Sequence, residues 1–307
     1  MEKVSVIIPC YNSSATIRHV VEDIRGELEG IYSYNIILTD DYSRDGVWNE
    51  IKKLCKENPN IVGLSLSQNF GQQSARMAAL EYADGDYVAF MDDDGQHVAS
   101  GITKMIGKLE EGYDIVYAHF PEKKESWFKK FGSNINRIMT DWIIGKPQDV
   151  IQTSFFVTRK YVVDELKKYE SPFPYLFGYL MQITRNIANV EIEHHERISG
   201  SSGYTFCKLV RLWTNGFTSF SVIPLRIASI VGIICACIGF VWGIFTVVSK
   251  IVNPSIMAGF TTTIAVILFC SGIIMLMLGI IGEYIGRIFI TINRIPQYVV
   301  RESVNTK

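Results

Sequence analysis

Short apolar runs alternate with amphipathic segments through the first 120 residues of the chain. Runs of roughly four to eight apolar residues predict buried strands, and apolar residues that recur every three or four positions predict helices. The predicted strands cover residues 4–8, 35–39, 61–66, 87–91 and 114–117, and the predicted helices cover residues 15–28, 47–56, 72–82 and 102–109. Strands that alternate with helices are typical of a doubly wound, mostly parallel α/β sheet.

Two much longer apolar runs lie near the C-terminus, at residues 227–248 and 256–281. Lys250 is the only charged residue between positions 227 and 282. A helix of about 20 apolar residues spans the roughly 30 Å hydrocarbon core of a bilayer, and both runs are long enough. Pro254, which lies between the runs, would break a continuous helix. We therefore predict a hairpin of two transmembrane helices over residues 227–282.

The segment before this hairpin predicts an amphipathic helix. Its apolar side chains recur at spacings of three and four and form one stripe: Phe206, Leu209, Val210, Trp213, Phe217 and Phe220. We interpret residues 205–226 as an interfacial helix in the lipid headgroup region, although such a stripe also fits packing on the protein's own soluble domain. The predicted organisation is a soluble domain over residues 1–204, the interfacial helix, the hairpin and a tail over residues 283–307.

Charge divides the chain in the same way. Residues 1–226 hold 25 basic and 29 acidic side chains, whereas residues 227–307 hold 5 and 2. A soluble part with a net charge of −4 gives no support for nucleic-acid binding. Basic residues flank the outer ends of the hairpin: Lys208, Arg211, Arg226, Arg287, Arg294 and Arg301. The positive-inside rule then places the soluble domain and both termini in the cytoplasm.

Acidic side chains follow two of the predicted strands. Asp40 and Asp41 end the second strand, and three aspartates, Asp92 to Asp94, end the fourth. Ligands of doubly wound sheets bind beyond the carboxyl ends of the strands, so these residues are candidates for a site. Adjacent carboxylates repel one another, and a bound cation offsets this repulsion. Oxygen ligands such as these suit Mg²⁺ or Mn²⁺. In extended chain Asp92 and Asp94 point to one side, Gln96 continues that alternation, and Asp93 faces away.

Four motifs at these strand ends carry a resemblance to a known family. They are VSVIIPCYN at 4–12, DDYSRDG at 40–46, SQNFG at 67–71 and FMDDDGQH at 90–97. In this order they resemble the motifs of family 2 inverting glycosyltransferases of GT-A fold. The strings ERISGSSGY at 196–204, FSVIPLR at 220–226 and GEYIGR at 282–287 resemble the polyprenyl-phosphate branch, which is GtrB-like and similar to dolichol-phosphate mannose synthase.

The resemblance implies roles for individual residues. The nucleotide would lie against Pro9, Tyr11, Asp40 and Asp41. The metal ion, Mg²⁺ or Mn²⁺, would be held by Asp92, Asp94 and Gln96, of which the two aspartates are catalytic. Arg197, also catalytic, would meet phosphate charge together with Ser202 and Tyr204. A basic segment at 122–137 follows the fifth strand, where an acceptor loop that includes Arg137 would lie, although a solvated basic helix has the same composition.

The implied reaction transfers a sugar from a nucleotide sugar to a polyprenyl phosphate. Asp40 and Asp41 are compatible with uridine or guanosine, and we favour a UDP-sugar. The alternatives are a processive membrane polysaccharide synthase and a non-catalytic nucleotide-sugar-binding scaffold. The synthase motif Q-x-x-R-W lacks its Trp at residues 182–186, and the intact Asp92-x-Asp94-x-Gln96 disfavours the scaffold. Because two spans form a thin bundle and relatives suggest a tetramer, we expect a homo-oligomer.

Overall fold

The computed structural model describes residues 1–120, 150–193, 223–253 and 259–306. The chain forms two compact units. The first contains Met1–Leu212 together with Ile295–Lys307, and the second contains Trp213–Arg294. Most of the predicted interfacial helix, residues 205–222, lies outside the described residues.

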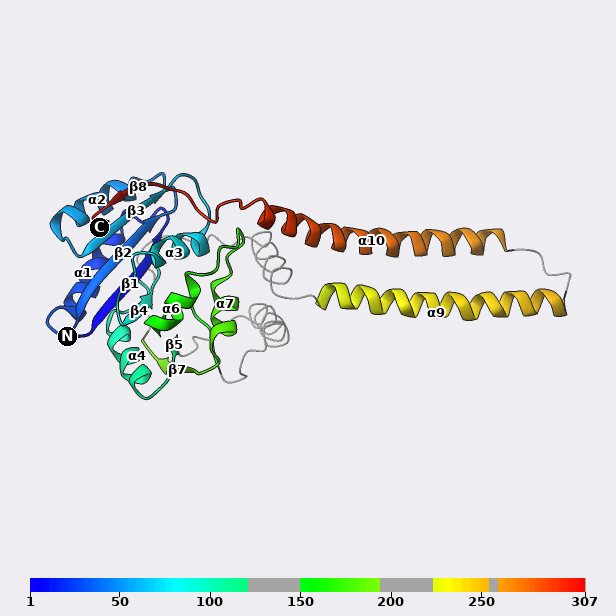
Figure 1. Ribbon diagram of the computed structural model, residues 1–307, viewed down its shortest axis with the longest axis horizontal. Helices are drawn as coiled ribbons and strands as arrows, with labels where there is room; N and C mark the ends of the chain where they lie inside the picture. The colour runs from blue at the N-terminus through cyan, green and yellow to red at the C-terminus, as the bar shows by residue number, and fades with distance from the viewer. Residues whose placement is uncertain (121–149, 194–222, 254–258, 307) are drawn as a thin grey trace. The chain divides into compact units, whose positions relative to one another are not determined.

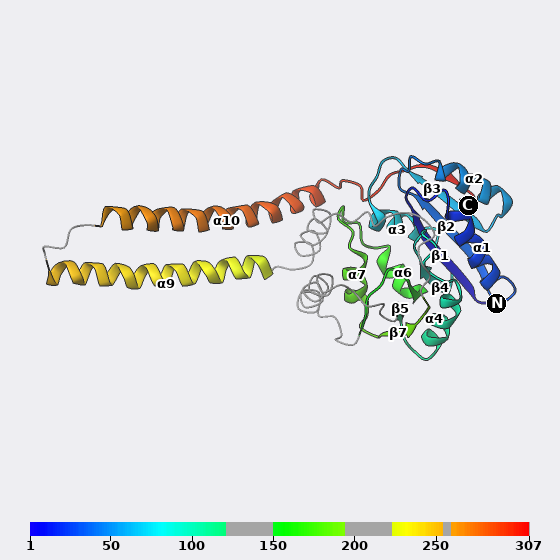
Figure 2. The same ribbon diagram turned by 180° about the vertical axis from the view of Figure 1, so that it is seen from behind.

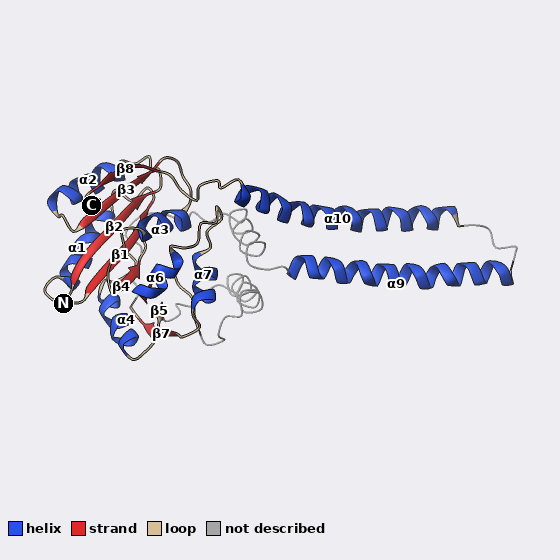
Figure 3. Ribbon diagram, viewed as in Figure 1, coloured by secondary structure: helices blue, strands red, loops and turns tan. Residues whose placement is uncertain are grey.

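The described part of the first unit is built on an eight-stranded sheet with the strand order β7-β5-β6-β4-β1-β2-β3-β8 (Figures 1 and 3). β1 is parallel to β2 and β4, β2 is parallel to β3, and β5 is parallel to β7. This confirms the predicted mostly parallel sheet. The strands are β1 (Lys3–Cys10), β2 (Ser33–Asp40), β3 (Ile61–Leu66), β4 (Tyr87–Phe90), β5 (Ile115–His119), β6 (Phe156–Arg159), β7 (Ile187–Glu191) and β8 (Val300–Val304).

Two strands run against this direction. β6 is antiparallel to both of its neighbours, β4 and β5, and Phe156 lies opposite Phe90. β8 is antiparallel to β3 and forms the edge of the sheet. Because β6 runs in reverse, its first residues lie at the edge where β4 ends.

Helices cover both faces of the sheet (Figures 1 and 2). One face is covered by α1 (Ile17–Leu28), α2 (Val47–Glu57) and α4 (Ser100–Glu110), and the other by α3 (Gln72–Leu80), α6 (Lys160–Leu166) and α7 (Leu176–Ile183). The apolar stripe of α1, which includes Ile17, Val21 and Ile24, packs into the same core as alternate residues of β1, among them Val4 and Val6. The helical period of 3.6 and the strand period of 2 thus meet on one face.

The second unit contains two long helices, α9 (Ile223–Val252) and α10 (Phe260–Ile292), which contact each other. Windows at Ala228–Phe245 and Phe269–Ile292 have mean hydropathies of 2.3 and 2.0. Their apolar side chains are exposed; Phe240 and Met275, for example, are 72% and 75% exposed. Both helices are long and apolar enough to cross a membrane.

The ends of these helices differ from the predicted boundaries. α9 begins at Ile223, so the last four residues of the predicted interfacial segment form its first turn. α10 continues to Ile292, ten residues beyond the predicted end of the hairpin. Glu283 and Arg287 lie one turn apart and form an ion pair of 2.9 Å, so the helix continues through both charges. Residues 283–307 therefore do not form a separate tail: their last part includes β8 of the first unit.

Candidate active site at the carboxyl edge of the sheet

Five aspartates gather at the carboxyl edge of the sheet because β1 pairs with both β2 and β4. Asp40 is the last residue of β2 and lies opposite Cys10 at the end of β1. Asp92, Asp93 and Asp94 begin two residues after β4 ends. Parallel strands bring these chain ends to one edge, which is where ligands bind in doubly wound sheets.

Asp40 and Asp41 are buried and bonded to the loops around them. Asp40 accepts hydrogen bonds from the Ser43 backbone N–H at 2.9 Å and the Ser65 hydroxyl at 3.3 Å. Asp41 accepts the backbone N–H groups of Phe70 and Gly71 at 2.7 and 2.9 Å. Burial raises the pKa of Asp41 to about 6, although both N–H bonds favour the ionised form. These carboxylates therefore shape the edge of the site between β2 and β3.

The loop after β1 is tied to the aspartates after β4. Asp93 accepts the Tyr11 backbone N–H at 2.9 Å, which is why its side chain points back toward β1. Burial raises the pKa of Asp93 to about 6. Pro9 is buried within β1, whereas the side chain of Tyr11 is 54% exposed. Of these two predicted nucleotide contacts, Tyr11 presents its ring at the surface of the site.

Asp92 forms a buried ion pair that the sequence analysis did not predict. One carboxylate oxygen accepts Arg76 Nη2 at 2.9 Å and Gln72 Nε2 at 2.7 Å, and the other accepts the Ser154 hydroxyl at 2.5 Å. Arg76 is 4% exposed. Burial by itself raises the pKa of Asp92, but the charges of Arg76 and His97 and these hydrogen bonds outweigh it and lower the pKa. A lone arginine inside an amphipathic helix gives no sequence signal of such a partner.

The predicted metal ligands supply oxygen atoms only. Asp94 accepts the Gln96 backbone N–H at 3.1 Å, so these two residues share a tight turn. No group of three His, Cys, Asp or Glu side chains that could hold a metal ion occurs in the parts of the chain that the structure describes. Two carboxylates and one amide fit Mg²⁺ or Mn²⁺ when substrate phosphates complete the shell. Asp92 would share its carboxylate between the metal ion and Arg76.

The C-terminal strand also reaches this edge. Arg301 of β8 donates a hydrogen bond from Nη2 to the Ser65 hydroxyl at 3.1 Å, and Ser65 in turn donates to Asp40. The Arg301 guanidinium also lies 5.9 Å from the centre of the Tyr42 ring. Arg301, which the sequence analysis counted among the residues that flank the membrane spans, therefore supports Asp40. Its separation of 236 residues from Ser65 hid this contact from sequence reasoning.

Four predicted site residues lie outside the described residues: Arg137, Arg197, Ser202 and Tyr204. The same holds for the segment at 122–137, which was predicted to approach the acceptor.

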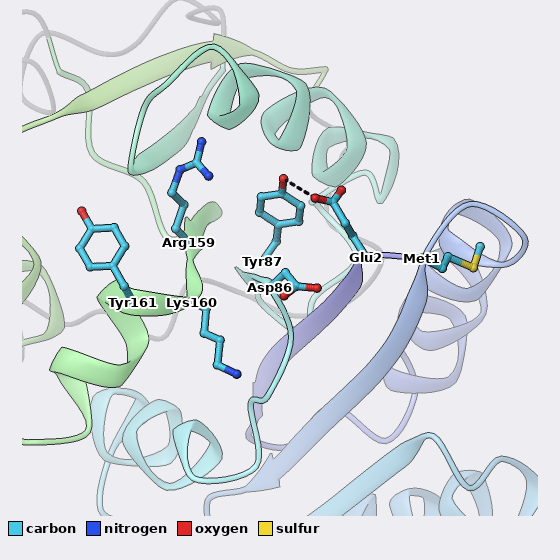
Figure 4. Close-up of a pocket in the computed structure, with 7 residues that line it drawn as sticks. All are labelled: Met1, Glu2, Asp86, Tyr87, Arg159, Lys160 and Tyr161. Atoms are coloured by element: carbon cyan, nitrogen blue, oxygen red, sulfur yellow. Dashed lines mark hydrogen bonds between the residues drawn. The ribbon is translucent and has the colours of Figure 1, made fainter.

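One cavity lies at each end of the parallel strands. At the carboxyl edge, a cavity of about 240 Å³ lies beside Asp92 and is lined by Arg76, Ser154 and Tyr117, among others. A larger, open cavity of about 490 Å³ lies at the opposite edge (Figure 4), where Tyr87 donates a hydrogen bond to Glu2. It is lined by Met1, Glu2, Asp86, Tyr87, Arg159, Lys160 and Tyr161. The amino ends of parallel strands are not where this architecture places ligands.

Comparison with solved structures agrees with the GT-A-like fold. Glucosyl-3-phosphoglycerate synthase from Mycobacterium tuberculosis, solved with Mn²⁺, UDP-glucose and phosphoglyceric acid, is 17% identical with a TM-score of 0.53 and covers 70% of this chain and 78% of its own. Mannosyl-3-phosphoglycerate synthase from Rubrobacter xylanophilus is 15% identical with a TM-score of 0.52 and covers 70% of this chain and 71% of its own.

Sequence comparisons cover the whole chain. An uncharacterised glycosyltransferase of Bacillus subtilis, YkcC, is 31% identical and covers 97% of this chain and 93% of its own length. The undecaprenyl-phosphate 4-deoxy-4-formamido-L-arabinose transferase of Proteus mirabilis is 29% identical and covers 100% and 95%. Residues 5–167 match glycosyl transferase family 2, and residues 223–288 match the GtrB C-terminal hairpin. The chain therefore belongs to glycosyltransferase family 2 and is a glycosyltransferase with a GtrB-type C-terminal hairpin.

Proposed function

We propose that the protein transfers a sugar from a UDP-sugar to undecaprenyl phosphate, with inversion at the anomeric carbon and with Mg²⁺ or Mn²⁺ as cofactor. One observation carries this proposal: relatives named as undecaprenyl-phosphate or bactoprenol sugar transferases align with both the catalytic unit and the two apolar helices. The Proteus mirabilis transferase covers 100% of the chain, and a bactoprenol glucosyl transferase homolog of Escherichia coli covers 97% at 29% identity.

The architecture supports a lipid acceptor. A nucleotide sugar is soluble in water, whereas a polyprenyl phosphate stays in the bilayer, so an enzyme that joins them gains from a membrane anchor beside its catalytic unit. The basic residues outside the hairpin favour a cell-membrane protein whose catalytic unit and termini are cytoplasmic. Two helices alone form a thin bundle, and we expect copies of the chain to associate, as a tetramer in the simplest case.

The donor would lie along the carboxyl edge of the sheet. The exposed ring of Tyr11 offers a surface for the nucleotide, and Asp40 and Asp41 hold the loops on either side. The metal ion would neutralise charge on the leaving nucleoside diphosphate. Asp94 and Gln96, in their shared turn, and Asp92, held by Arg76, are the residues that would hold it.

The acceptor needs little activation. The second pKa of a phosphate monoester is about 6, so a lipid phosphate is largely a dianion at neutral pH and attacks the anomeric carbon without a strong base. Direct attack on the face opposite the leaving group inverts the configuration at that carbon. The task of the protein is then alignment and control of charge. We assign the acceptor phosphate to Arg197, Ser202, Tyr204 and Arg137.

A transfer assay tests the proposal. The purified full-length protein is incubated with undecaprenyl phosphate, Mg²⁺ or Mn²⁺ and labelled UDP-glucose, UDP-galactose, UDP-N-acetylglucosamine or GDP-mannose. We expect a chloroform-extractable, acid-labile product from at least one UDP-sugar, and loss of that product with EDTA. A long water-soluble polymer would point to the polysaccharide synthase, and tight binding of a donor without transfer would point to the scaffold.

The metal assignment has its own variant. Asp94→Asn keeps the size of the side chain and removes its charge, so we expect transfer to fall by at least about 100-fold, the scale for lost electrostatic stabilisation in an active site. Membrane insertion and thermal stability should stay close to wild type because Asp94 is partly exposed. Retained transfer in this variant would refute the role of Asp94.

A further inference from the structure

The loop after β4 carries the three residues that we expect to hold the metal ion, and a hydrogen bond joins its two ends. The loop runs from Asp92 to His97, and Asp94 and Gln96 lie between them. The backbone N–H of Asp92 donates to Nδ1 of His97 at 3.2 Å. Gly95, between Asp94 and Gln96, has a φ of 73°, which lies in the left-handed region that favours glycine. His97 therefore closes a tight turn that contains every expected metal ligand.

The ring of His97 is held by aromatic side chains from outside the loop. The side chain of His97 is 5% exposed. Its ring stacks on that of Phe155, with 4.8 Å between ring centres and 13° between the planes, and on that of Phe120, at 5.7 Å and 9°. Phe120 directly follows β5 and Phe155 directly precedes β6. Because nearly parallel stacking restricts the tilt of the imidazole, β5 and β6 together fix the direction of the acceptor Nδ1.

Asp92 is held at its carboxylate and at its backbone by different parts of the fold. Arg76 and Gln72 of α3 donate to one carboxylate oxygen, and the Ser154 hydroxyl donates to the other. His97 accepts the backbone N–H, and its Nε2 lies 3.9 Å from the carboxylate oxygen that Ser154 contacts. With the side chain of Asp92 fixed by α3 and Ser154, the bond to His97 determines how the chain returns at the end of the loop.

The remaining residues of the loop show why this closure matters. Asp93 accepts the Tyr11 backbone N–H at 2.9 Å, and its carbonyl oxygen accepts the Thr16 hydroxyl at 2.6 Å, so the start of the loop is also tied to the segment after β1. Asp94 and Gln96 are joined to each other by a bond of 3.1 Å inside the turn. The arrangement of these two ligands against the first one therefore depends on the closure of the loop. Mg²⁺ demands a nearly ideal octahedral arrangement of its ligands, so small shifts of this turn weaken binding.

We infer that His97 is a positioning residue of the metal site: its Nδ1 closes the loop and sets Asp92, Asp94 and Gln96 in the arrangement that a divalent cation requires. The inference rests on the proposed function, because it assumes that these residues hold the cation. When Nδ1 accepts a hydrogen bond in a neutral imidazole, Nε2 carries the ring hydrogen, so neither nitrogen offers a lone pair to the cation. His97 thus acts on the cation through the loop.

The test separates the acceptor atom from the ring. His97→Phe keeps a flat ring beside Phe155 and Phe120 but has no acceptor for the Asp92 N–H, and His97→Leu provides a second variant without an acceptor. His97→Asn loses the ring but places an amide oxygen near the position of Nδ1. Dissociation constants for Mn²⁺ are measured by electron paramagnetic resonance on the full-length protein in detergent, alone and with UDP, and a titration of UDP without protein is subtracted.

The variants should differ in metal affinity according to the acceptor. His97→Phe and His97→Leu should bind Mn²⁺ about 10- to 100-fold more weakly, the scale for losing a group that holds metal ligands in place. His97→Asn should bind Mn²⁺ close to wild type. Its melting temperature should nevertheless fall, because it loses both ring contacts and leaves a space between them. Metal affinity and stability are therefore expected to change independently.

Two controls test whether any destabilising or any histidine substitution has the same effect. Asn305→Ala loses two hydrogen bonds to the carbonyls of Cys55 and Ile61, and Ile61 begins β3 at the end of the strand opposite the site. It should lower the melting temperature and leave the Mn²⁺ dissociation constant unchanged. His19→Phe makes the same substitution at an exposed histidine of α1 and should change neither quantity.

The outcomes separate this inference from the function on which it rests. Equal Mn²⁺ affinity of His97→Phe and wild type overturns the inference, and so does an equal loss in His97→Phe and His97→Asn, because the acceptor atom would then have no role. In both cases a chloroform-extractable product in the transfer assay leaves the proposed function standing. If Mn²⁺ does not bind wild type, with or without UDP, the metal dependence of the proposed function fails, and the role of His97 fails with it.

Discussion

The buried ion pair between Arg76 and Asp92 predicts a large loss of stability when Arg76 is replaced by Met. Methionine keeps an unbranched apolar side chain of similar length but removes the charge that compensates Asp92. The two groups lie 2.9 Å apart, and Arg76 is 4% exposed. Coulomb's law at an effective dielectric constant of about 20 gives about 6 kcal/mol for such a pair, and losing one partner of a buried pair costs about 3–5 kcal/mol.

The remaining contacts of Asp92 decide where in this range the loss falls. Gln72 and Ser154 still donate to its two oxygens in the variant. We therefore expect the lower end, about 3 kcal/mol, which corresponds to a melting temperature roughly 6–12 °C lower for a unit of about 200 residues. The assay is thermal unfolding of the full-length protein in detergent, followed by a probe of the catalytic unit such as tryptophan fluorescence.

An exposed arginine provides the matched control. Arg18→Met makes the same substitution at a residue that pairs with Glu50 at 2.6 Å and Glu57 at 2.8 Å but is 37% exposed. Exposed pairs contribute about 0–1 kcal/mol, so this variant should unfold close to wild type. In Arg76→Met with Asp92→Asn, the uncompensated charge is gone and part of the stability should return. Equal melting temperatures for Arg76→Met and Arg18→Met would refute the reasoning.

Two further predictions concern the loops and the C-terminal strand. Burial raises the pKa of Asp41 from 3.8 to about 6, so the folded state binds the proton of this carboxyl more tightly than the unfolded state does. The wild-type protein should therefore lose up to about 3 kcal/mol of unfolding free energy, relative to Asp41→Asn, as the pH rises from below 4 to above 6. Denaturant unfolding of both proteins across this pH range measures the difference. A difference independent of pH would contradict it. Asn305 has a positive φ of 59° and donates to the backbone carbonyls of Cys55 and Ile61 at 2.7 and 2.8 Å. Asn305→Ala should lower the free energy of unfolding by about 2 kcal/mol because both hydrogen bonds are lost. Asn305→Gly should lower it less, because glycine tolerates this φ, and thermal unfolding measures both variants.

Local periodicity explains which parts of the fold could be predicted from the sequence. The first five strands and four helices follow from burial patterns that repeat within each segment, as in α1, where Ile17, Val21 and Ile24 share one face. The gathering of the aspartates at one edge could also be predicted from the sequence, because parallel strands bring their carboxyl ends together whatever their order in the sheet. For the same reason the motifs after β1, β2 and β4 indicated the family, which the comparisons confirm.

Pairing between distant segments explains what could not be predicted. β6 lies between β4 and β5 in reverse direction, and nothing in Phe156–Arg159 specifies its neighbours. Arg76 was expected only as a polar position of a helix, and its role depends on the packing of α3 against the end of β4. The unpartnered hydroxyl of Tyr117 is likewise a property of the assembled core, because a tyrosine in an apolar strand usually finds a partner.

The strand β8 connects the end of the chain to Asp40 at the carboxyl edge of the sheet. It pairs with β3, whose edge has no other strand among the described residues, and it brings Arg301 to Ser65, which donates to Asp40. Residues 300–304 follow both long helices in the sequence, so during synthesis β3 stays an open edge until the hairpin has been made. An open edge of apolar residues favours pairing between chains, and β8 removes that risk. The contact of Arg301 with Ser65, and through Ser65 with Asp40, therefore forms only after both long helices have been synthesised.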